Sequence, residues 1–294
     1  MSPQLSPRMI RSNSWRRSLF AEYEADHIAH PIDGYETQRL GCVTRYLPLE
    51  HKHGGAFLAF TRLRQDEERS LIREQVAFFQ ERCKSFEWKT YGFDEPNDLP
   101  ELLRAERFVA DSVEALLVFP TLRALRKRNA SKLRGIEFRK AVVGDATLAD
   151  VVKVQEAVWK RSFHWLEAHL YHALEARGDD LLVFCAYARS RPVGSGWITF
   201  RRASRFAELH GGAVLDEMRG RGIYSELFRA RADEARRRDC EFLAVDALPM
   251  SRPILESKGF DYICDTCPMQ FSTRNFPAAT EPYGDAFYLR RQTS

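Results

Sequence analysis

The alternation of apolar and polar residues in the second half of the chain predicts an α/β domain. Short apolar runs are typical of buried strands, and apolar positions spaced three and four apart are typical of amphipathic helices. The predicted strands are 136–143, 181–189, 192–201, 211–215, 241–246 and 262–272, and the predicted helices are 147–176, 222–238 and 251–259. The resulting order, β-α-β-β-β-α-β-α-β, covers about half of the chain.

The first half shows a similar pattern. Its predicted strands are 38–48, 55–64, 86–91 and 113–119, and its predicted helices are 66–84 and 98–107. The stretches 86–108 and 241–260 both run from a strand through a turn with an aspartate and a proline into a helix that ends before a phenylalanine. This similarity indicates an internal repeat in which the first half is a degenerate copy of the second. The alternative is two unrelated α/β pieces of similar order.

These patterns divide the chain into four parts. We expect a flexible tail over 1–37, an N-terminal α/β domain over 38–122, a basic linker over 123–135 and a C-terminal domain over 136–294. The tail begins with four arginines and no acid in its first twenty residues, and two prolines there favour a solvated tail over a transit peptide. The stretch 123–140 holds eight basic residues and one acid, which favours a solvated linker over a nucleic-acid contact.

Composition narrows the class of protein. Hydrophobic residues make up 44% of the chain, which is enough for a buried core, and no apolar run approaches a membrane span. The net charge of +4 makes nucleic acid an unlikely partner, and six cysteines without a signal peptide fit a reduced, cytoplasmic protein. We interpret Cys264 and Cys267 as ordinary thiols, since residues three apart on a strand point to opposite faces, and we expect no metal. The oligomeric state stays open.

Glycines and arginines gather where an apolar strand meets an amphipathic helix, over 211–228. Small residues let the backbone approach an anion, and the first N–H groups of a helix attract negative charge. Arg219 and Arg221 add full positive charges. The chain has no Gly-x4-Gly-Lys-Ser/Thr string, and Gly220-Arg-Gly222 lacks the third glycine of the dinucleotide fingerprint. The pattern therefore predicts a phosphate site of another kind.

This loop resembles the acyl-CoA loop of the GCN5-related N-acetyltransferases (GNAT), whose pattern is Arg/Gln-x-x-Gly-x-Gly/Ala. Arg219 and Gly222 match the pattern, and Tyr224 departs from its small last residue. The resemblance implies a GNAT-like mixed sheet flanked by helices, in one or two tandem copies, and acetyl-CoA as co-substrate. It implies that the donor is bound by Gly212, Ala213, Val214, Arg219, Gly220, Arg221, Gly222, Ile223, Tyr224 and Ser225.

Transfer of an acyl group to an amine also needs a base, because an amine is almost fully protonated at neutral pH. In the histone-acetyltransferase branch of the family a glutamate stands eleven residues before the loop, after Phe-Ala, as Glu208 does here. Alternation along a strand places His210 on the same face. Both are candidate bases; the alternatives are an ion pair with an arginine for Glu208 and a buried structural role for His210.

The acid that protonates the leaving thiolate is less clear. Much of the family has a tyrosine where this chain has Leu255, which leaves water, Tyr224 or an unassisted thiolate. The sequence thus predicts an acyl-CoA-dependent N-acyltransferase, most simply an acetyltransferase, with direct attack by an amine of a small molecule or peptide. A catalytically inactive acyl-CoA-binding or protein-interaction module is the first alternative, and an aminoacyl-tRNA-dependent transferase is the second.

Overall fold

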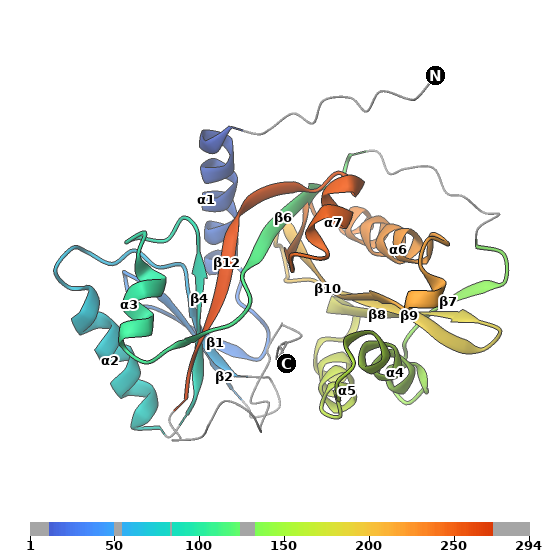
Figure 1. Cartoon of the computed structure of the whole chain (residues 1–294), viewed down its shortest axis with the longest axis horizontal. Coiled ribbons are helices and arrows are strands. Elements are labelled where there is room, and N and C mark those ends of the chain that lie inside the picture. Colours follow the sequence, from blue (N-terminus) through green and yellow to red (C-terminus); the bar gives the residue numbers. More distant parts are fainter. Residues whose placement is uncertain (1–11, 50–54, 83, 124–132, 273–294) are drawn as a thin grey trace.

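The computed structural model describes residues 12–49, 55–82, 84–123 and 133–272, and Figure 1 shows their arrangement. In chain order the helices and strands are α1 (Asn13–Ala29), β1 (Tyr35–Arg39), β2 (Thr44–Pro48), β3 (Ala56–Ala59), α2 (Glu68–Gln80), β4 (Phe86–Tyr91), α3 (Leu99–Ala105), β5 (Val109–Ala110), β6 (Glu114–Pro120), β7 (Ile136–Lys140), α4 (Thr147–Trp159), α5 (Leu166–Arg177), β8 (Leu181–Ala188), β9 (Arg191–Thr199), β10 (Phe206–Val214), α6 (Ile223–Arg237), β11 (Phe242–Ala247), α7 (Arg252–Lys258) and β12 (Asp261–Phe271). The fold class is therefore α/β, as predicted.

One 12-stranded sheet joins the two halves. Its order is β1-β2-β3-β4-β12-β6-β11-β10-β9-β8-β7, with β5 paired to β12. In the first half β1, β2 and β3 are antiparallel and β3 pairs in parallel with β4. In the second half β8, β9 and β10 are antiparallel and β10 pairs in parallel with β11. The two halves therefore repeat the same arrangement, in agreement with the predicted internal repeat.

The two halves exchange their last strands. We expected 262–272 to complete the sheet of the second half, but β12 instead pairs with β4, β5 and β6 of the first half. In return β6 pairs with β11 of the second half. Figure 1 shows β12 running from one half into the other. A buried ion pair strengthens this seam, since Lys89 Nζ of β4 donates to Asp246 Oδ2 of β11 over 2.5 Å.

The predicted flexible tail over 1–37 is wrong for most of its described part, because Asn13–Ala29 forms helix α1. The Ser12 hydroxyl accepts the N–H of Trp15 and caps the helix. Its apolar side buries Leu19, Phe20 and Tyr23 against strands of both halves. Polar residues on the same side obscured this helix in the sequence, because a buried aspartate and histidine (Asp26 and His27) interrupt the apolar stripe. Residues 1–11 lie outside the described residues.

Two other expected elements are divided. The predicted helix 147–176 is two helices, α4 and α5, which are separated after Lys160 takes a left-handed conformation. The predicted strand 38–48 is the β1-β2 hairpin, which turns near Gly41 at φ +81°. The predicted linker falls largely on residues 124–132, outside the described residues, so the boundary between the two domains stays a prediction.

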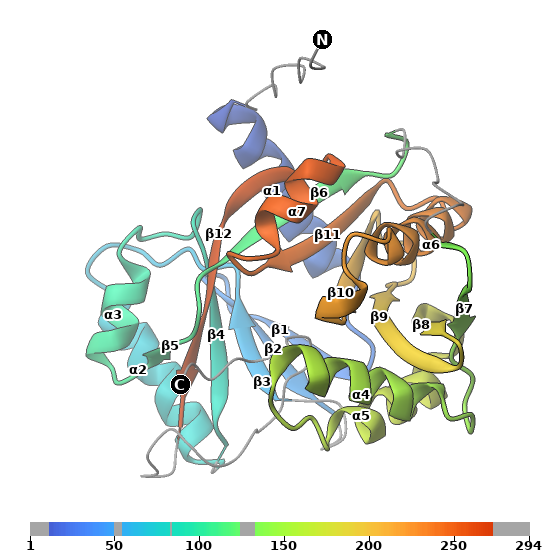
Figure 2. The same ribbon diagram turned by 45° about the vertical axis from the view of Figure 1, so that its right-hand side comes forward.

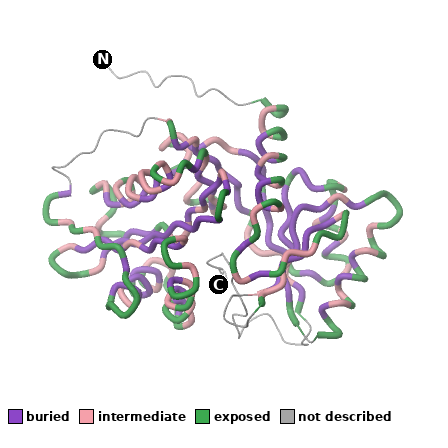
Figure 3. The backbone as a smooth tube through the Cα atoms, turned by 180° about the vertical axis from the view of Figure 1, so that it is seen from behind, coloured by how far each residue is buried: buried purple, intermediate pink, exposed green. Residues whose placement is uncertain are grey.

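Helices cover both faces of the sheet, as the rotated view in Figure 2 shows. Along β6, Leu116 and Val118 pack in the cluster under α1, whereas Leu117 and Phe119 pack in the cluster under α6 and α7. Helices α4 and α5 pack over β8 and β9. Figure 3 shows that burial is concentrated along the central strands, which hold the residues of the site.

Candidate active site

A β-bulge in β10 opens the sheet at the predicted donor site. The register between β9 and β10 shifts between His210 and Ala213, and Gly211 at the bulge has φ +57°. A Cβ at this glycine would lie 1.8 Å from the Trp197 ring, so only glycine fits. The parallel register of β10 with β11 covers Phe206–Glu208, after which β11 continues along β6. The two parallel strands therefore separate beside the bulge.

Side chains hold the bulge carbonyls. Gln155 Nε2 of α4 donates to the Gly211 carbonyl oxygen over 2.7 Å, and the Ser195 hydroxyl of β9 donates to it over 3.3 Å. Arg231 Nη1 of α6 donates to the His210 carbonyl oxygen over 3.2 Å. In a trans peptide the C=O and the following N–H point in opposite directions. The Gly212 N–H therefore points away from Gln155 and Ser195.

The predicted phosphate loop leads into α6 through two glycines with positive φ, Gly220 at +75° and Gly222 at +85°. No side-chain hydrogen bond caps the start of α6 in the described structure. Arg219 is largely exposed and pairs with Asp216 over 2.7 Å, so its charge remains at the surface beside the loop. Lys258 of α7 donates to the Ser225 hydroxyl over 2.5 Å and adds a second cation near the helix start. This arrangement fits an anionic group such as a phosphate.

Tyr224 lies against the backbone of the bulge. A Cβ built on Gly212 would be 3.0 Å from the Tyr224 ring and 3.3 Å from its hydroxyl oxygen. Burial raises the pKa of Tyr224, so the phenol keeps its proton at neutral pH. The ammonium of Lys258 lies 5.4 Å from the ring centroid. The residue that departs from the family pattern thus lies against the backbone of the bulge.

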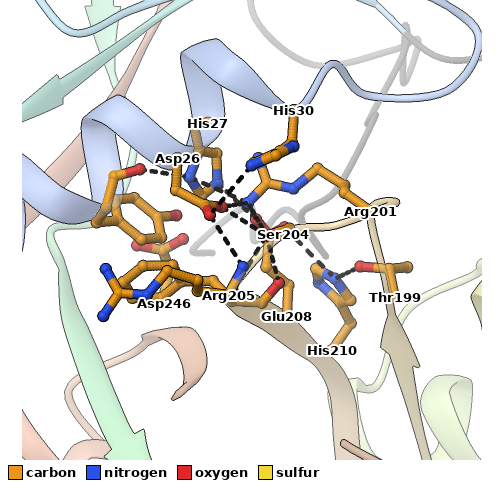
Figure 4. A network of polar contacts seen from close by, with 12 residues as sticks. Asp26, His27, His30, Thr199, Arg201, Ser204, Arg205, Glu208, His210 and Asp246 are labelled. Carbon is orange, nitrogen blue, oxygen red and sulfur yellow. Dashed lines mark hydrogen bonds and ion pairs between the residues drawn. The ribbon is translucent and has the colours of Figure 1, made fainter. Parts of the chain in front are cut away.

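Glu208 is held by an ion-pair network that reaches α1, shown in Figure 4. His27 Nε2 is 2.6 Å from Glu208 Oε1, and Arg201 Nη2 is 3.6 Å from the same oxygen. Burial would raise the pKa of Glu208, but the His27 hydrogen bond and the Arg201 charge outweigh it and hold the pKa well below its usual range. Glu208 is therefore a bound carboxylate with a weakened ability to accept a proton.

Asp26, Ser204 and Arg205 also belong to this network. Asp26 Oδ2 accepts the Ser204 hydroxyl over 2.5 Å and pairs with Arg201 over 3.3 Å, while its Oδ1 accepts the Arg205 backbone N–H. These bonds tie α1 to the turn before β10. The N-terminal helix thereby becomes part of the second half's site.

His210 lies on the same face of β10 as Glu208, as the alternation of the strand predicts. Its Nε2 is 3.0 Å from the Thr199 hydroxyl and 3.9 Å from Glu208 Oε2. Burial lowers the pKa of His210 to about 4, against the opposing charge of Glu208. His210 is therefore neutral at physiological pH, which is the state that accepts a proton.

Sequence reasoning missed the residues that support these groups, although some signals were present. Arg231 follows Leu227 by four residues and precedes Ala235 by four, so it belongs to the buried stripe of α6. Gln155 similarly follows the buried Val151 on α4. A polar residue within an apolar stripe indicates a buried hydrogen bond. His27 gave no such signal, because its partner lies 181 residues away.

Metal-ligating side chains do not gather in groups of three or more within the described ranges. Cys264 and Cys267 are buried free thiols on β12, and burial raises the pKa of Cys267 to about 11. No helix over these ranges has the length and apolarity to cross a bilayer.

Residues 148–254 match the model of the Acetyltransferase (GNAT) family, and no curated protein matches the sequence. A GCN5-related N-acetyltransferase from Kribbella flavida has a similar structure, with 10% identity, a TM-score of 0.60, and coverage of 89% of this chain and 96% of that one. One from Sphaerobacter thermophilus has 14% identity and a TM-score of 0.55, covering 90% and 95%. A tandem GNAT protein from the clavulanic acid biosynthesis pathway has 10% identity and a TM-score of 0.56, covering 87% and 89%. At these identities the likeness shows the fold.

Proposed function

We propose that this protein transfers an acyl group, most simply acetyl from acetyl-CoA, directly to an amine, because residues 148–254 match the GNAT family model. The observation that carries the proposal is the gap in the pairing of β10 with β11 beside a bulge, next to an α6 start without a side-chain cap. A pantetheine arm fits such a gap, and a pyrophosphate fits such a helix start. The acceptor class is a small-molecule or peptide amine.

In this proposal the donor binds to the residues that the sequence identified. The pyrophosphate contacts the backbone from Arg219 to Ser225, with Lys258 as a further cation. The pantetheine follows Gly212–Val214 on β10. The Gly212 N–H donates to the thioester carbonyl oxygen as it becomes an oxyanion, because this N–H points away from the Gln155 and Ser195 side chains that hold the Gly211 carbonyl.

The chemistry is then divided among three side chains. The amine attacks the carbonyl carbon, which forms the C–N bond, and His210 accepts the proton that the nitrogen loses, directly or through a water molecule. Glu208 stabilises the resulting imidazolium through its negative charge. The C–S bond breaks as the tetrahedral intermediate collapses, and Tyr224 donates its proton to the leaving thiolate, in place of the tyrosine that is absent at position 255. The products are the amide and free CoA.

Calorimetric titration with acetyl-CoA tests the donor site. We expect micromolar binding in the wild type, and loss of about tenfold or more in Arg219→Ala and Gly222→Asp, because the first removes a cation and the second adds an anion at the helix start. Gly41→Asp is the matched control, since Gly41 also has positive φ and open space around it but lies in the first half. An absence of binding in the wild type would contradict the proposal.

The position of Tyr224 also favours a second candidate, a non-catalytic acyl-CoA-binding module. A ring against Gly212 can occupy part of the pantetheine path instead of serving as an acid. Thiol release from acetyl-CoA with a panel of amines separates the two. If Tyr224 is the acid, Tyr224→Phe slows turnover and leaves affinity unchanged. If the ring obstructs the gap, Tyr224→Phe changes nothing and Tyr224→Gly tightens binding.

A further inference from the structure

Two buried polar side chains, Gln155 and Arg231, hold the β10 bulge by hydrogen bonds from opposite faces of the sheet. These contacts together form the bulge grip. Gln155 approaches from α4, and its amide donates both to the Gly211 carbonyl and to the Ser195 hydroxyl, each over 2.7 Å. The Trp159 indole N–H donates to Gln155 Oε1 over 2.9 Å, which fixes the orientation of the amide. Gln155 and Ser195 are fully buried. This chain of hydrogen bonds therefore sets the direction of the Gly211–Gly212 peptide.

Arg231 grips the preceding peptide from α6. Its Nη1 donates to the carbonyl oxygens of His210 and Trp197, which face each other on β10 and β9, and its Nε donates to Leu227. A Cβ on Gly196 would lie 2.9 Å from the guanidinium carbon, so the absence of a side chain there makes room for it. The guanidinium thus lies where the hydrogen-bonded ladder between β9 and β10 is interrupted.

Burying the charge of an arginine costs free energy unless hydrogen bonds or an opposite charge compensate for it. Arg231 is 2% exposed, and the hydrogen bonds recorded for it go to carbonyl oxygens of the backbone. Burial lowers the pKa of Arg231 to about 10, so the guanidinium still carries its charge at neutral pH. Well-packed apolar residues often replace buried charges without loss of stability. A buried arginine at this place therefore points to a role beyond stability.

We propose that Gln155 and Arg231 are positioning residues for acyl transfer, which fix the two consecutive bulge peptides so that the Gly212 N–H is aimed at the acyl oxygen. This inference rests on the proposed function for the meaning of that N–H. The geometry of the grip itself does not depend on the ligand. Positioning of this kind matters because a misplacement of about 1 Å can cost on the order of a hundredfold in rate.

Hydrogen exchange of the unliganded protein, measured by mass spectrometry, tests the grip. We expect Gln155→Leu and Arg231→Met to raise exchange selectively in the segment 206–215, with β8 unchanged. Ser195→Ala removes one of two donors to Gly211 and should have a smaller effect in the same segment. Gln75→Leu is the matched control, because Gln75 is equally buried and accepts from Arg45 in the first half.

Kinetics then test the consequence in the full chain. With the best amine of the thiol-release panel, we expect kcat to fall about tenfold to a hundredfold in Gln155→Leu and Arg231→Met, with a change below about threefold in the Kd of acetyl-CoA. Arg231→Lys keeps the charge and one donor nitrogen, and should recover part of the kcat that Arg231→Met loses.

The outcomes separate this inference from the proposed function. Exchange in 206–215 no higher than in Gln75→Leu would overturn the inference, even if the protein acetylates amines normally. Raised exchange together with an unchanged kcat would also overturn it, because the grip would then be structural. A wild type without acetyl-CoA binding would end the proposed function, while the exchange data would still decide whether the bulge is held.

Discussion

The two parallel strand pairs among the described residues, β3-β4 and β10-β11, differ in what lies past the last paired residue. In the first half, β3 pairs with β4 over Ala56–Leu58. Beyond this pairing, hydrogen bonds continue to join the segments that follow the two strands. The Glu95 N–H donates to the Thr61 carbonyl over 3.0 Å, and the Leu63 N–H donates to the Glu95 carbonyl over 2.8 Å. The buried Asp94 carboxylate accepts the N–H groups of Thr61 and Tyr91. This gap is closed.

In the second half the pairing of β10 with β11 ends at Glu208, and the Gly211 bulge follows. The difference teaches that one fold can carry two different strand edges, and in the proposed function only the second edge binds the donor. That edge has a bulge that interrupts the ladder, a glycine that permits it and side chains that hold it. The first half also lacks the Arg/Gln-x-x-Gly-x-Gly/Ala loop, so we expect it to bind no acyl-CoA in this mode.

The largest effect is expected from Gly211→Ala, which disrupts the bulged edge of the second half. The new Cβ meets the Trp197 ring at 1.8 Å and the backbone keeps a positive φ. Strain and overpacking together should cost about 4 kcal/mol of unfolding free energy. Gly41→Ala in the first half shares the positive φ but has open space, so it should cost about 1 kcal/mol. Urea unfolding of both variants measures the difference, and equal losses would show that the bulge is not tightly packed.

Asp94→Ala breaks the closed side. Two buried N–H groups lose their acceptor, which should cost about 3 kcal/mol. Asp94→Asn keeps one acceptor oxygen and should lose less. If the alanine variant unfolds at the wild-type urea concentration, the stitching contributes nothing to the closed gap.

The Asp94 carboxyl should also make the free energy of unfolding depend on pH. Burial raises the pKa of Asp94 to about 7, against the opposing hydrogen bonds from Tyr91 and Thr61. The pKa of an aspartate in the unfolded chain is near 3.9, so the native state binds the Asp94 proton more tightly than the unfolded state does. The contribution of this proton to the free energy of unfolding is therefore lost as pH rises from about 4 through 7. Asp94→Asn should remove that part of the pH dependence in urea unfolding between pH 5 and pH 8.

A smaller effect is expected from His27→Leu, which removes the contact of α1 with Glu208. Loss of a hydrogen bond to a buried carboxylate should cost about 2 kcal/mol. The affinity for acetyl-CoA should stay unchanged, because His27 contacts Glu208 and not the loop. His172→Leu, at an exposed histidine of α5, is the control and should change neither quantity. Equal unfolding curves for both variants would contradict a role of α1 in holding Glu208.

The smallest effect concerns His210. Because burial lowers the pKa of His210 to about 4, protonation of this base should not reduce kcat as pH falls from 8 to about 5.5. The profile should be measured with an amine that is already unprotonated across this range. An acid limb near pH 6.5 would indicate an unperturbed histidine and would contradict the structure of the site.

Local features could be predicted from the sequence, and long-range ones could not. The strand, glycine loop and helix over 211–228 are encoded within a few residues, as is the shared face of Glu208 and His210. The ion pair of Glu208 with His27 joins residues 181 positions apart and has no local signature. The exchange of β6 and β12 was equally hidden, because the same apolar alternation fits either neighbour in a sheet. Tyr224 was recognised as unusual, but its place against Gly212 depends on where β10 bends.

The exchange of β6 and β12 also determines when the sheet can be completed during protein synthesis. β4 pairs with β3 on one edge, but its other edge has no partner until β12 has been made, so the first half keeps an unpaired strand edge while almost the whole chain is translated. Contacts between segments this distant in sequence form slowly, and exposed edges invite association with other chains. We therefore expect refolding to be slow and dependent on concentration, and the halves to acquire their stability in a single late step.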